Sequence, residues 1–427
     1  MGIGEVNADV FAELARFLSV DQVAAMRMAS KQLKWATDQF VIPVQLNAIK
    51  RKHFYDSYTS KSTTDYHKLL AFSNTDENWH TASSRTTQLL HTHSSIPVLV
   101  AHHNLLILGS RSAVFVWDRR RTRYTRFIIS NQNRASMDIT GLVVLQYNGA
   151  FLSLMSSHVA GLVQRVVLNL DTKKCSQTAI YNAGGPWMDV TRSQNVRTLK
   201  GDHEAVISAR EIGRLDVLSP NSPWSKPASV DVETSRLWGV DWNRRSGLLT
   251  VSHNYNSTTQ SSVSLYRATQ DGICADGHID TPNKESSFTA TNGTSTNGVL
   301  ASPDITVVGY YDSSVRVYDH RCSRQSEVQC YQDNLDPQPI YSVDVGGAHD
   351  SMICAGSSLY SRLRVIDARM PTNQALHIYA ADSSDRSSPV YQLQVDHSHC
   401  YLATDCKVHD INFSTDAPNE RFATARV

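Results

Sequence analysis

The sequence predicts an all-β propeller of seven blades that follows a small all-α module at the N-terminus. Two observations predict it: a strand pattern that repeats along most of the chain, and a helical pattern confined to residues 1–45. The 427 residues can bury a substantial core. Since 41 Lys and Arg face 40 Asp and Glu, the net charge of +1 gives no sign of a nucleic-acid-binding protein.

The repeating feature is a short alternating strand that ends in Asp, followed by an arginine two residues later. It is clearest in the strands that end at Asp118, Asp319 and Asp367. Weaker copies end at Asp171, Ser219, Arg267 and Asn412. Successive copies lie 45 to 53 residues apart, a period typical of propellers and solenoids.

Each period also holds an earlier strand with the pattern apolar-x-x-apolar-x-apolar. Copies begin at Ile96, Ile139, Leu237, Ile340 and Val390. Turn residues such as Ser302-Pro303-Asp304 separate three or four short strands in each period, with no helical window. Seven repeats therefore predict seven four-stranded blades closed in a ring, which leaves few sheet edges exposed. We expect the segment from Trp79 to Leu90 to complete the last blade.

The repeats resemble the WD-repeat (WD40) family. Trp117-Asp118 supplies the dipeptide for which that family is named, and GYYDSSVRVYDHR resembles its consensus from the second strand through the third. We therefore expect a WD-repeat propeller over residues 79–427.

The first 45 residues follow a helical period. Val10, Phe11, Leu14, Phe17 and Leu18 fall on one helical face. A second helix should open with Ser19 and Gln22 as a capping box and turn Val23, Met26 and Leu33 inward. Three helices of this size cannot form a stable core alone.

The order of these residues resembles an F-box, the module that binds the adaptor Skp1. Val6, Asp9, Val10, Glu13, Leu14, Leu18, Val23 and Ser30-Lys31 fall on its pattern. It departs where Val6-Asn7 replaces the usual Leu-Pro and Leu33 replaces the usual Trp. The resemblance implies the Skp1-binding residues Val6, Val10, Phe11, Leu14, Leu18, Val23 and Leu33. The alternative is a helical cap packed on the propeller, with its apolar face covered.

Residues 46–78 are polar and basic and could form a helical spacer or a flexible linker. The run from Thr59 to Asp65 indicates a loop. Glu77-Asn78-Trp79, with Arg85 and Leu89-Leu90 behind, resembles the joint in the dactylin-like branch of F-box/WD proteins.

The resemblance implies a substrate-recognition subunit of an SCF (Skp1–cullin–F-box) ubiquitin ligase. The helical module would bind a Skp1-like adaptor of the cullin–RING ligase, and the propeller would bind the target protein. The alternatives are a WD-repeat scaffold whose helices are structural or bind another partner, and an enzyme built on a propeller. The sequence contains no GxxxxGK, GxGxxG, HExxH or GxSxG motif, so we expect no catalytic residues and no cofactor.

Two sets of side chains are candidates for target binding. The loops between the second and third strands carry Arg111, Tyr310, Tyr311 and Tyr360. The inner strands carry aromatic residues directly after their first apolar residue, at Trp238, Tyr341 and Tyr391. Repeat packing would also explain this second set. Aromatic and arginine side chains are typical hot spots of interfaces, and we expect a mixed apolar and acidic peptide as the ligand.

Two further clusters have simpler explanations. Arg119-Arg120-Arg121, Arg123 and Arg126 form a basic patch, either a solvated loop or a docking site for an acidic peptide. His397, His399, Cys400, Cys406 and His409 include zinc-type ligands, but their spacing fits no known finger, so we expect no metal. Seven cysteines, no signal peptide and no membrane-spanning run indicate a reduced cytoplasmic or nuclear setting.

Overall fold

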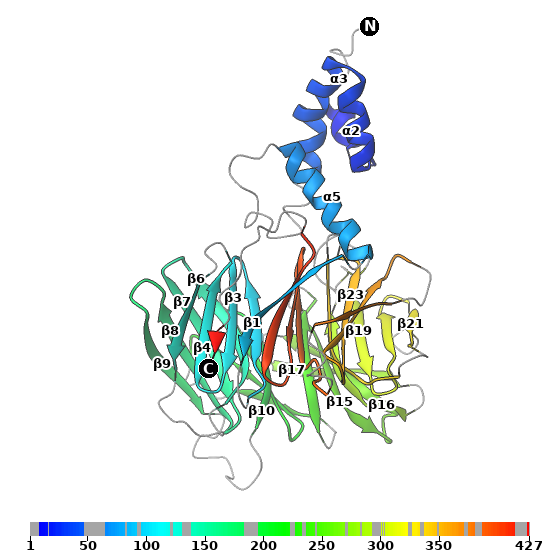
Figure 1. The fold of residues 1–427 in the computed structure, drawn as a ribbon. Coiled ribbons are helices and arrows are strands. Elements are labelled where there is room, and N and C mark those ends of the chain that lie inside the picture. The colour runs from blue at the N-terminus through cyan, green and yellow to red at the C-terminus, as the bar shows by residue number, and fades with distance from the viewer. Residues whose placement is uncertain are drawn as a thin grey trace.

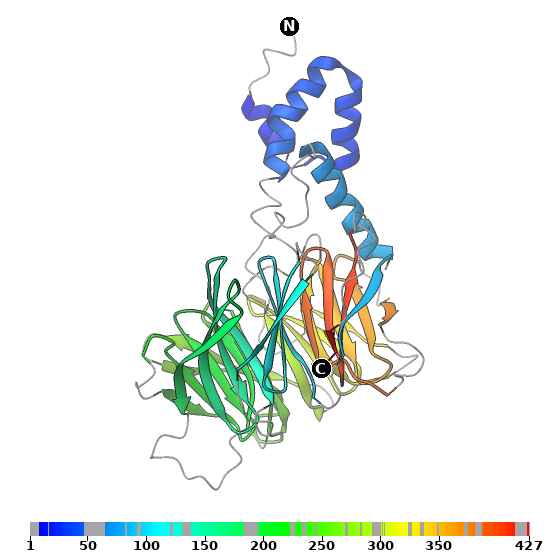
Figure 2. The ribbon, with the colours of Figure 1, turned by 60° about the vertical axis from the view of Figure 1, so that its left-hand side comes forward.

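The computed structural model contains a ring of seven β-sheets with a helical module above one face (Figures 1 and 2). It describes residues 8–46 and 65–426 except for residues 16, 82, 92–94, 120–122, 130–137, 183–194, 223–226, 233–235, 244–245, 270–271, 282–283, 293–299, 301, 303, 323–326, 334–336, 348–349, 371–374, 381–386 and 415–424.

Each of the first six blades is a four-stranded antiparallel sheet in sequence order. Blades one and two contain β2 (Val98–His102), β3 (Leu105–Ser110), β4 (Ala113–Asp118), β5 (Arg123–Ile128), and β6 (Ile139–Tyr147), β7 (Phe151–His158), β8 (Leu162–Asn169), β9 (Lys174–Asn182). Blades three and four contain β10 (Val196–Gly201), β11 (Val206–Arg210), β12 (Arg214–Leu218), β13 (Ala228–Asp231), and β14 (Leu237–Asn243), β15 (Leu248–Asn256), β16 (Ser261–Thr269), β17 (Gly272–Asp280). Blades five and six contain β18 (Ser287–Asn292), β19 (Ile305–Tyr310), β20 (Val315–Asp319), β21 (Gln329–Tyr331), and β22 (Ile340–Gly346), β23 (Met352–Ser357), β24 (Arg362–Asp367), β25 (Leu376–Tyr379).

The seventh blade closes the ring with a strand from the beginning of the propeller. It contains β26 (Gln392–Val395), β27 (His399–Ala403), β28 (Lys407–Asn412), β1 (Arg85–His91) and β29 (Ala425–Arg426). β1 pairs antiparallel with β28, and β29 pairs parallel with β1. The predicted seven-bladed propeller is therefore confirmed, and the repeating Asp-ended strands are the third strands of the blades. The closing strand begins later than the predicted Trp79, because a helix continues to Thr81 and the pairing with β28 starts at Arg85.

Neighbouring blades pack through buried aliphatic side chains. Between blades one and two, Ile107 and Val116 meet Leu142 and Leu154, all buried. Burying one such side chain contributes ~1.5–3 kcal/mol, so these layers supply most of the stability of the ring. Because successive side chains of a strand point to opposite faces of the sheet, each blade presents buried residues to both of its neighbours.

A β-bulge near the start of the inner strand explains the apolar-x-x-apolar pattern. In five blades the pairing with the second strand skips one residue. The skipped residues are Thr140, Arg197, Trp238, Phe288 and Tyr341. Because the extra residue shifts the alternation by one place, two consecutive non-core positions separate the first two core positions.

The helical module contains α1 (Ala8–Leu14), α2 (Val20–Ala29), α3 (Lys31–Ala36) and a π-helical turn, η2 (Thr37–Val41), which continues as an α-helix over 42–46. The predicted capping box is present, since the Gln22 N–H donates to Ser19 Oγ at 3.2 Å and the Ser19 N–H donates to Gln22 Oε1 at 2.8 Å. The same helices bury Phe11, Val23 and Ile42 in a common core.

Helix α5 (Asp65–Thr81) joins the module to the propeller (Figure 1). Near its start, Leu69 is buried in the apolar cluster that also holds the core of the module. Near its end, Trp79 is fully buried, its Nε1–H donates to the carbonyl of His397 at 2.9 Å, and the Asn78 amide donates to the carbonyl of Phe413 at 2.7 Å. Between the two predicted alternatives, residues 65–81 form a helical spacer packed at both ends.

Candidate interaction surfaces

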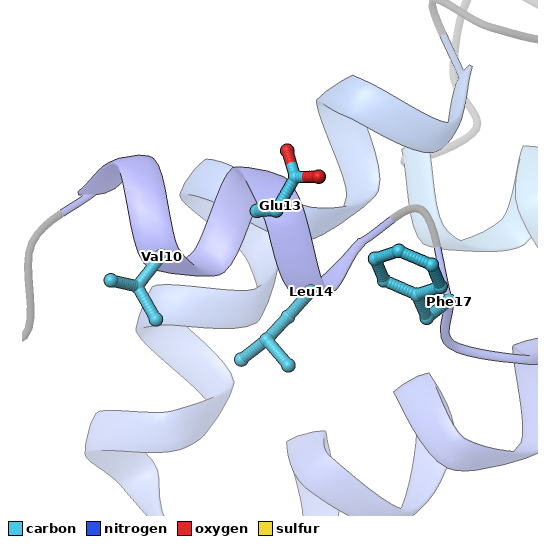
Figure 3. Close-up of a pocket in the computed structure, with 4 residues that line it drawn as sticks. All are labelled: Val10, Glu13, Leu14 and Phe17. Atoms are coloured by element: carbon cyan, nitrogen blue, oxygen red, sulfur yellow. The ribbon is translucent and has the colours of Figure 1, made fainter.

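The first surface is an exposed apolar face on the helical module. Val10, Leu14 and Phe17 are 49%, 43% and 77% exposed, and with Glu13 they line a shallow pocket (Figure 3). The three apolar residues follow the i, i+4, i+7 spacing of one helical face, although α1 itself ends at Leu14.

The structure divides the predicted Skp1-binding residues between this face and the core. Val10 and Leu14 are exposed, whereas Phe11 and Val23 are buried, with the Phe11 ring 6.2 Å from that of Phe40. The expected exposure of Phe11 is therefore wrong. Leu18 and Leu33 are half-buried against the module core, and Val6 lies outside the described residues. Phe17 belongs to this exposed face, although it was not among the predicted Skp1-binding residues. Its place on the same helical face as Val10 and Leu14 could have identified it.

The second surface is the face of the propeller opposite α5. Trp79 contacts His397, in the turn between β26 and β27, and Phe413, directly after β28. The bulged ends of the inner strands lie at the other face, beside the turns between second and third strands. For example, the N–H groups of Ile139 and Leu237 donate to the carbonyls of Arg111 and Glu211 in the preceding blades. We call this the distal face.

The predicted loop residues differ in exposure. Tyr311 is 53% exposed, but Tyr310 is 1% exposed and its hydroxyl lies 2.8 Å from that of Tyr318. The expected place of Tyr310 on the rim is therefore wrong, because it is the last residue of β19 and packs between the blades. Arg111 and Tyr360 are exposed in hairpin turns with φ of 51° and 65°, the left-handed region that non-glycine residues rarely adopt.

Tyrosines of blades five to seven gather on the distal face. The ring centroids of Tyr341 and Tyr391 are 5.9 Å apart with planes at 45°. Burial raises the pKa of Tyr341, and the neighbouring Tyr311 raises it further. Burial also raises the pKa of Tyr391, whose hydroxyl donates to the Asp405 carboxylate.

Trp238 lies in a separate cluster on blades three and four. Its indole N–H donates to Asn254 Oδ1 at 2.7 Å. The guanidinium carbons of Arg236 and Arg197 lie 4.2 Å and 5.5 Å from the ring centroid, and both guanidinium groups bind Glu211, at 2.8 Å and 2.9 Å. Burial alone would raise the pKa of Glu211. The two arginines outweigh burial and lower this pKa. The structure thus places Trp238, Arg111 and the tyrosines in three parts of the distal face.

Charged side chains form a deeper layer, three residues after the bulge. These are Lys200, Asp241 and Asp344, and Lys200 Nζ lies 3.2 Å from Asp241 Oδ1. Asp241, and more weakly Asp344, raises the pKa of Lys200. Burial raises the pKa of Asp344 to about 6, although the Val395 N–H and Lys200 act against the shift. Blades three and six are not neighbours, so the interaction of Lys200 with Asp344 indicates that both side chains point into the central channel.

Arg119 of the basic patch and His399 of the His/Cys cluster make contacts within the propeller. Arg119 pairs with Asp396 and lies over the Tyr401 ring, which joins blade one to blade seven, while residues 120–122 lie outside the described part. His399 Nδ1 lies 2.7 Å from Asp410 Oδ1, and both side chains are buried. Within the described residues, no group of three or more His, Cys, Asp or Glu is arranged to hold a metal ion.

The fold and these surfaces define a class: a seven-bladed propeller that carries a helical module on a packed spacer. No protein-family model matches the chain. It is similar to the F-box/WD repeat-containing protein 4 of Mus musculus, with 31% identity over 112 residues, or 26% of each chain. It is also similar to the Homo sapiens protein of the same name, with 32% identity over 103 residues, or 24% of each chain. The matches thus cover about a quarter of the length of these curated relatives.

Together with the propeller fold, these similarities support a relationship to the F-box/WD-repeat family. Among the described helices, none is both long and apolar enough to cross a membrane.

Proposed function

We propose that the chain is the substrate-recognition subunit of an SCF ubiquitin ligase. Its helical module binds a Skp1-like adaptor, which links it to the cullin–RING ligase, and its propeller binds a target protein for ubiquitination. The observation that carries this proposal is the exposed face of Val10, Leu14 and Phe17 on a module that stands away from the propeller (Figures 2 and 3). Clustered exposed apolar side chains mark interaction sites.

A partner that covers the exposed apolar face of the helical module would gain binding free energy. Val10, Leu14 and Phe17 keep about half or more of their surface in solvent. Moving each such side chain out of water contributes up to ~1.5–3 kcal/mol to binding, and a hydrophobic partner helix or groove gains this from all of them at once.

The spacer supports a positional role. Because α5 is packed on the module at one end and on blades six and seven at the other, it holds the two surfaces in a fixed relation. A ligase subunit without bond chemistry of its own acts by raising the effective concentration of target lysines near the conjugating enzyme. The family resemblance of the Glu77–Trp79 joint further supports a place in the dactylin-like branch.

The alternative of a scaffold with a packed helical cap is less well supported. A packed cap requires the α1 face to be buried against the propeller, whereas Val10 and Leu14 are exposed. We find no observation that favours the scaffold over the ligase subunit.

The test is co-purification of the full chain with Skp1. Changing Leu14→Asp places a charge in the centre of the apolar face and should abolish capture of the adaptor. The matched control is Ile128→Asp, which changes an apolar residue of similar exposure on the outer strand β5. Loss of capture with Leu14→Asp alone, with unchanged melting of the propeller, supports the proposal. Capture that survives Leu14→Asp overturns it.

A further inference from the structure

We propose that the mouth of the central channel on the distal face, at blades six and seven, binds a lysine or arginine side chain of an extended partner segment. Tyr341 and Tyr391 provide the aromatic faces, and Asp405 with the channel carboxylates provides the opposite charge. The inference rests on the proposed function only in taking this face as the one that meets the target protein.

The two aromatic residues occupy corresponding positions at the start of the inner strands of blades six and seven. Tyr341 is a bulge residue of β22, skipped in the pairing with β23. Tyr391 occupies the corresponding place before β26, where its N–H donates to the carbonyl of Ala403. Since bulges redirect side chains out of the regular ladder, the Tyr341 ring turns toward the channel mouth, where it meets the ring of Tyr391. Their centroids are 5.9 Å apart, and their inclined planes leave aromatic faces at an angle to each other.

The protein itself contains a comparable contact between a cation and an aromatic ring. Trp238 is the bulge residue of blade four, and the Arg236 guanidinium lies 4.2 Å from its ring centroid. A bulged aromatic residue at this mouth therefore already holds a cation over its face. Such contacts contribute ~0.5–2 kcal/mol, more when they are desolvated.

Carboxylates at the mouth and deeper in the channel supply negative charge. Asp405 is exposed and accepts a hydrogen bond from the Tyr391 hydroxyl, which orients its carboxylate next to the ring. Deeper in the channel, Asp344 accepts hydrogen bonds from the N–H groups of Val395 at 2.7 Å and Val345 at 2.9 Å. Asp241 pairs with Lys200. The three carboxylates and the one ammonium of Lys200 together carry two negative charges in excess.

The opposite wall of the mouth, at blades three and four, carries the cations that an acidic side chain would need. The cations there, Arg197 and Arg236, share the single carboxylate of Glu211 and stack near Trp238, so they leave one net positive charge, which lies at blades three and four and away from the tyrosine pair. Asp344 accepts hydrogen bonds from backbone N–H groups, and Lys200, which is paired with Asp241, is the one ammonium near both carboxylates, so Asp241, Asp344 and Lys200 together keep one negative charge in excess. The sequence-based expectation of an acidic peptide joined Arg111 to the tyrosines, but Arg111 lies between blades one and two.

The experiment uses the full chain and pools of nine-residue peptides. Each pool has one fixed central residue, either Lys, Arg, Leu, Glu or phosphoserine, with the other positions randomised. We expect the Lys and Arg pools to be retained about fivefold or more above the Glu and Leu pools, the size of one cation–aromatic contact. Raising the salt concentration should reduce this preference.

Variants locate the site. Tyr391→Leu and Asp405→Asn should each bring the Lys and Arg pools down to the level of the Leu pool. Tyr391→Phe, which keeps the ring and removes the hydroxyl, should retain part of the preference. Tyr379→Leu, an exposed tyrosine on the outer strand β25, is the matched control and should leave it unchanged. Circular dichroism and melting curves confirm that each variant folds.

Three results would overturn the inference: a preference for Glu or phosphoserine, no retention of any pool, or a basic preference that persists in Tyr391→Leu and Asp405→Asn. A phosphoserine preference would indicate the arginine cluster of blades three and four as the binding site. Capture of Skp1 in the same samples reports on the proposed function independently, so the two can fail separately.

Discussion

The indole ring of Trp79 stacks on the ring of Phe413, with centroids 3.6 Å apart and planes inclined by 15°. Trp79 lies near the end of the spacer helix, and Phe413 follows the third strand of the last blade. The contact therefore joins two segments that are far apart in sequence, next to the place where β1 closes the ring. Both side chains are fully buried, so the same contact also fixes the helical module on the propeller.

Replacing Trp79→Ala should lower the free energy of unfolding by ~3–5 kcal/mol, the usual cost of removing a large buried aromatic side chain. The loss of the hydrogen bond to the His397 carbonyl adds to it. Chemical denaturation followed by circular dichroism measures the change. Trp35→Ala, which removes an exposed tryptophan from the module, is the control and should cost much less. Equal effects of the two changes would contradict the assigned role of Trp79.

The pair formed by Arg119 and Asp396 should stabilise the junction between blades one and seven. Burial alone would raise the pKa of Asp396, but the charges of Arg119 and His399 and the hydrogen bond from the Ser398 N–H outweigh it and lower this pKa to about 2. Changing Arg119→Gln leaves a partly buried carboxylate without its cation and should cost roughly 3 kcal/mol. The double variant Arg119→Gln with Asp396→Asn should recover part of this loss. A double variant less stable than the sum of the single changes would contradict the pairing.

Asp344 should make the stability of the propeller depend on pH. Its pKa is raised from 3.8 to about 6 in the folded protein, so the folded state binds the proton more tightly than the unfolded chain. The resulting stabilisation is complete below pH 4 and is lost as the pH rises to about 6. Asp344→Asn removes this term. The unfolding free energy of the natural protein minus that of the variant should therefore fall between pH 4 and 6 and stay constant above pH 7. A constant difference throughout would refute the prediction.

Two adjacent tyrosines should respond in opposite ways. Tyr310→Phe removes a hydrogen bond between buried hydroxyl groups and should cost about 1 kcal/mol of stability without changing target binding. Tyr311→Ala changes an exposed side chain and should alter stability by less than about 0.5 kcal/mol while weakening retention of proteins on the propeller. Thermal melting and pull-down of bound proteins test both. Weaker binding by Tyr310→Phe at unchanged stability would show that the buried assignment is wrong.

The number of blades, the place of the strand that closes the ring, though not its start, and the capping box of α2 could be predicted from the sequence. Each of these depends on local or periodic information: the recurrence of Asp-ended strands, the turn residues between them, and the spacing of Ser19 and Gln22. Such patterns are readable because every blade meets similar neighbours and repeats the same solution.

Tertiary structure alone decided which of two neighbouring side chains is buried. Phe11 and Tyr310 are buried while Val10 and Tyr311 are exposed, although both members of each pair suit an interface by residue type. Only the tertiary structure brought Lys200 and Asp344 of non-adjacent blades into one channel, and placed α5 on the face opposite the tyrosines. The physical reason is that burial and charge depend on the elements that pack against a residue, and those elements come from distant parts of the chain.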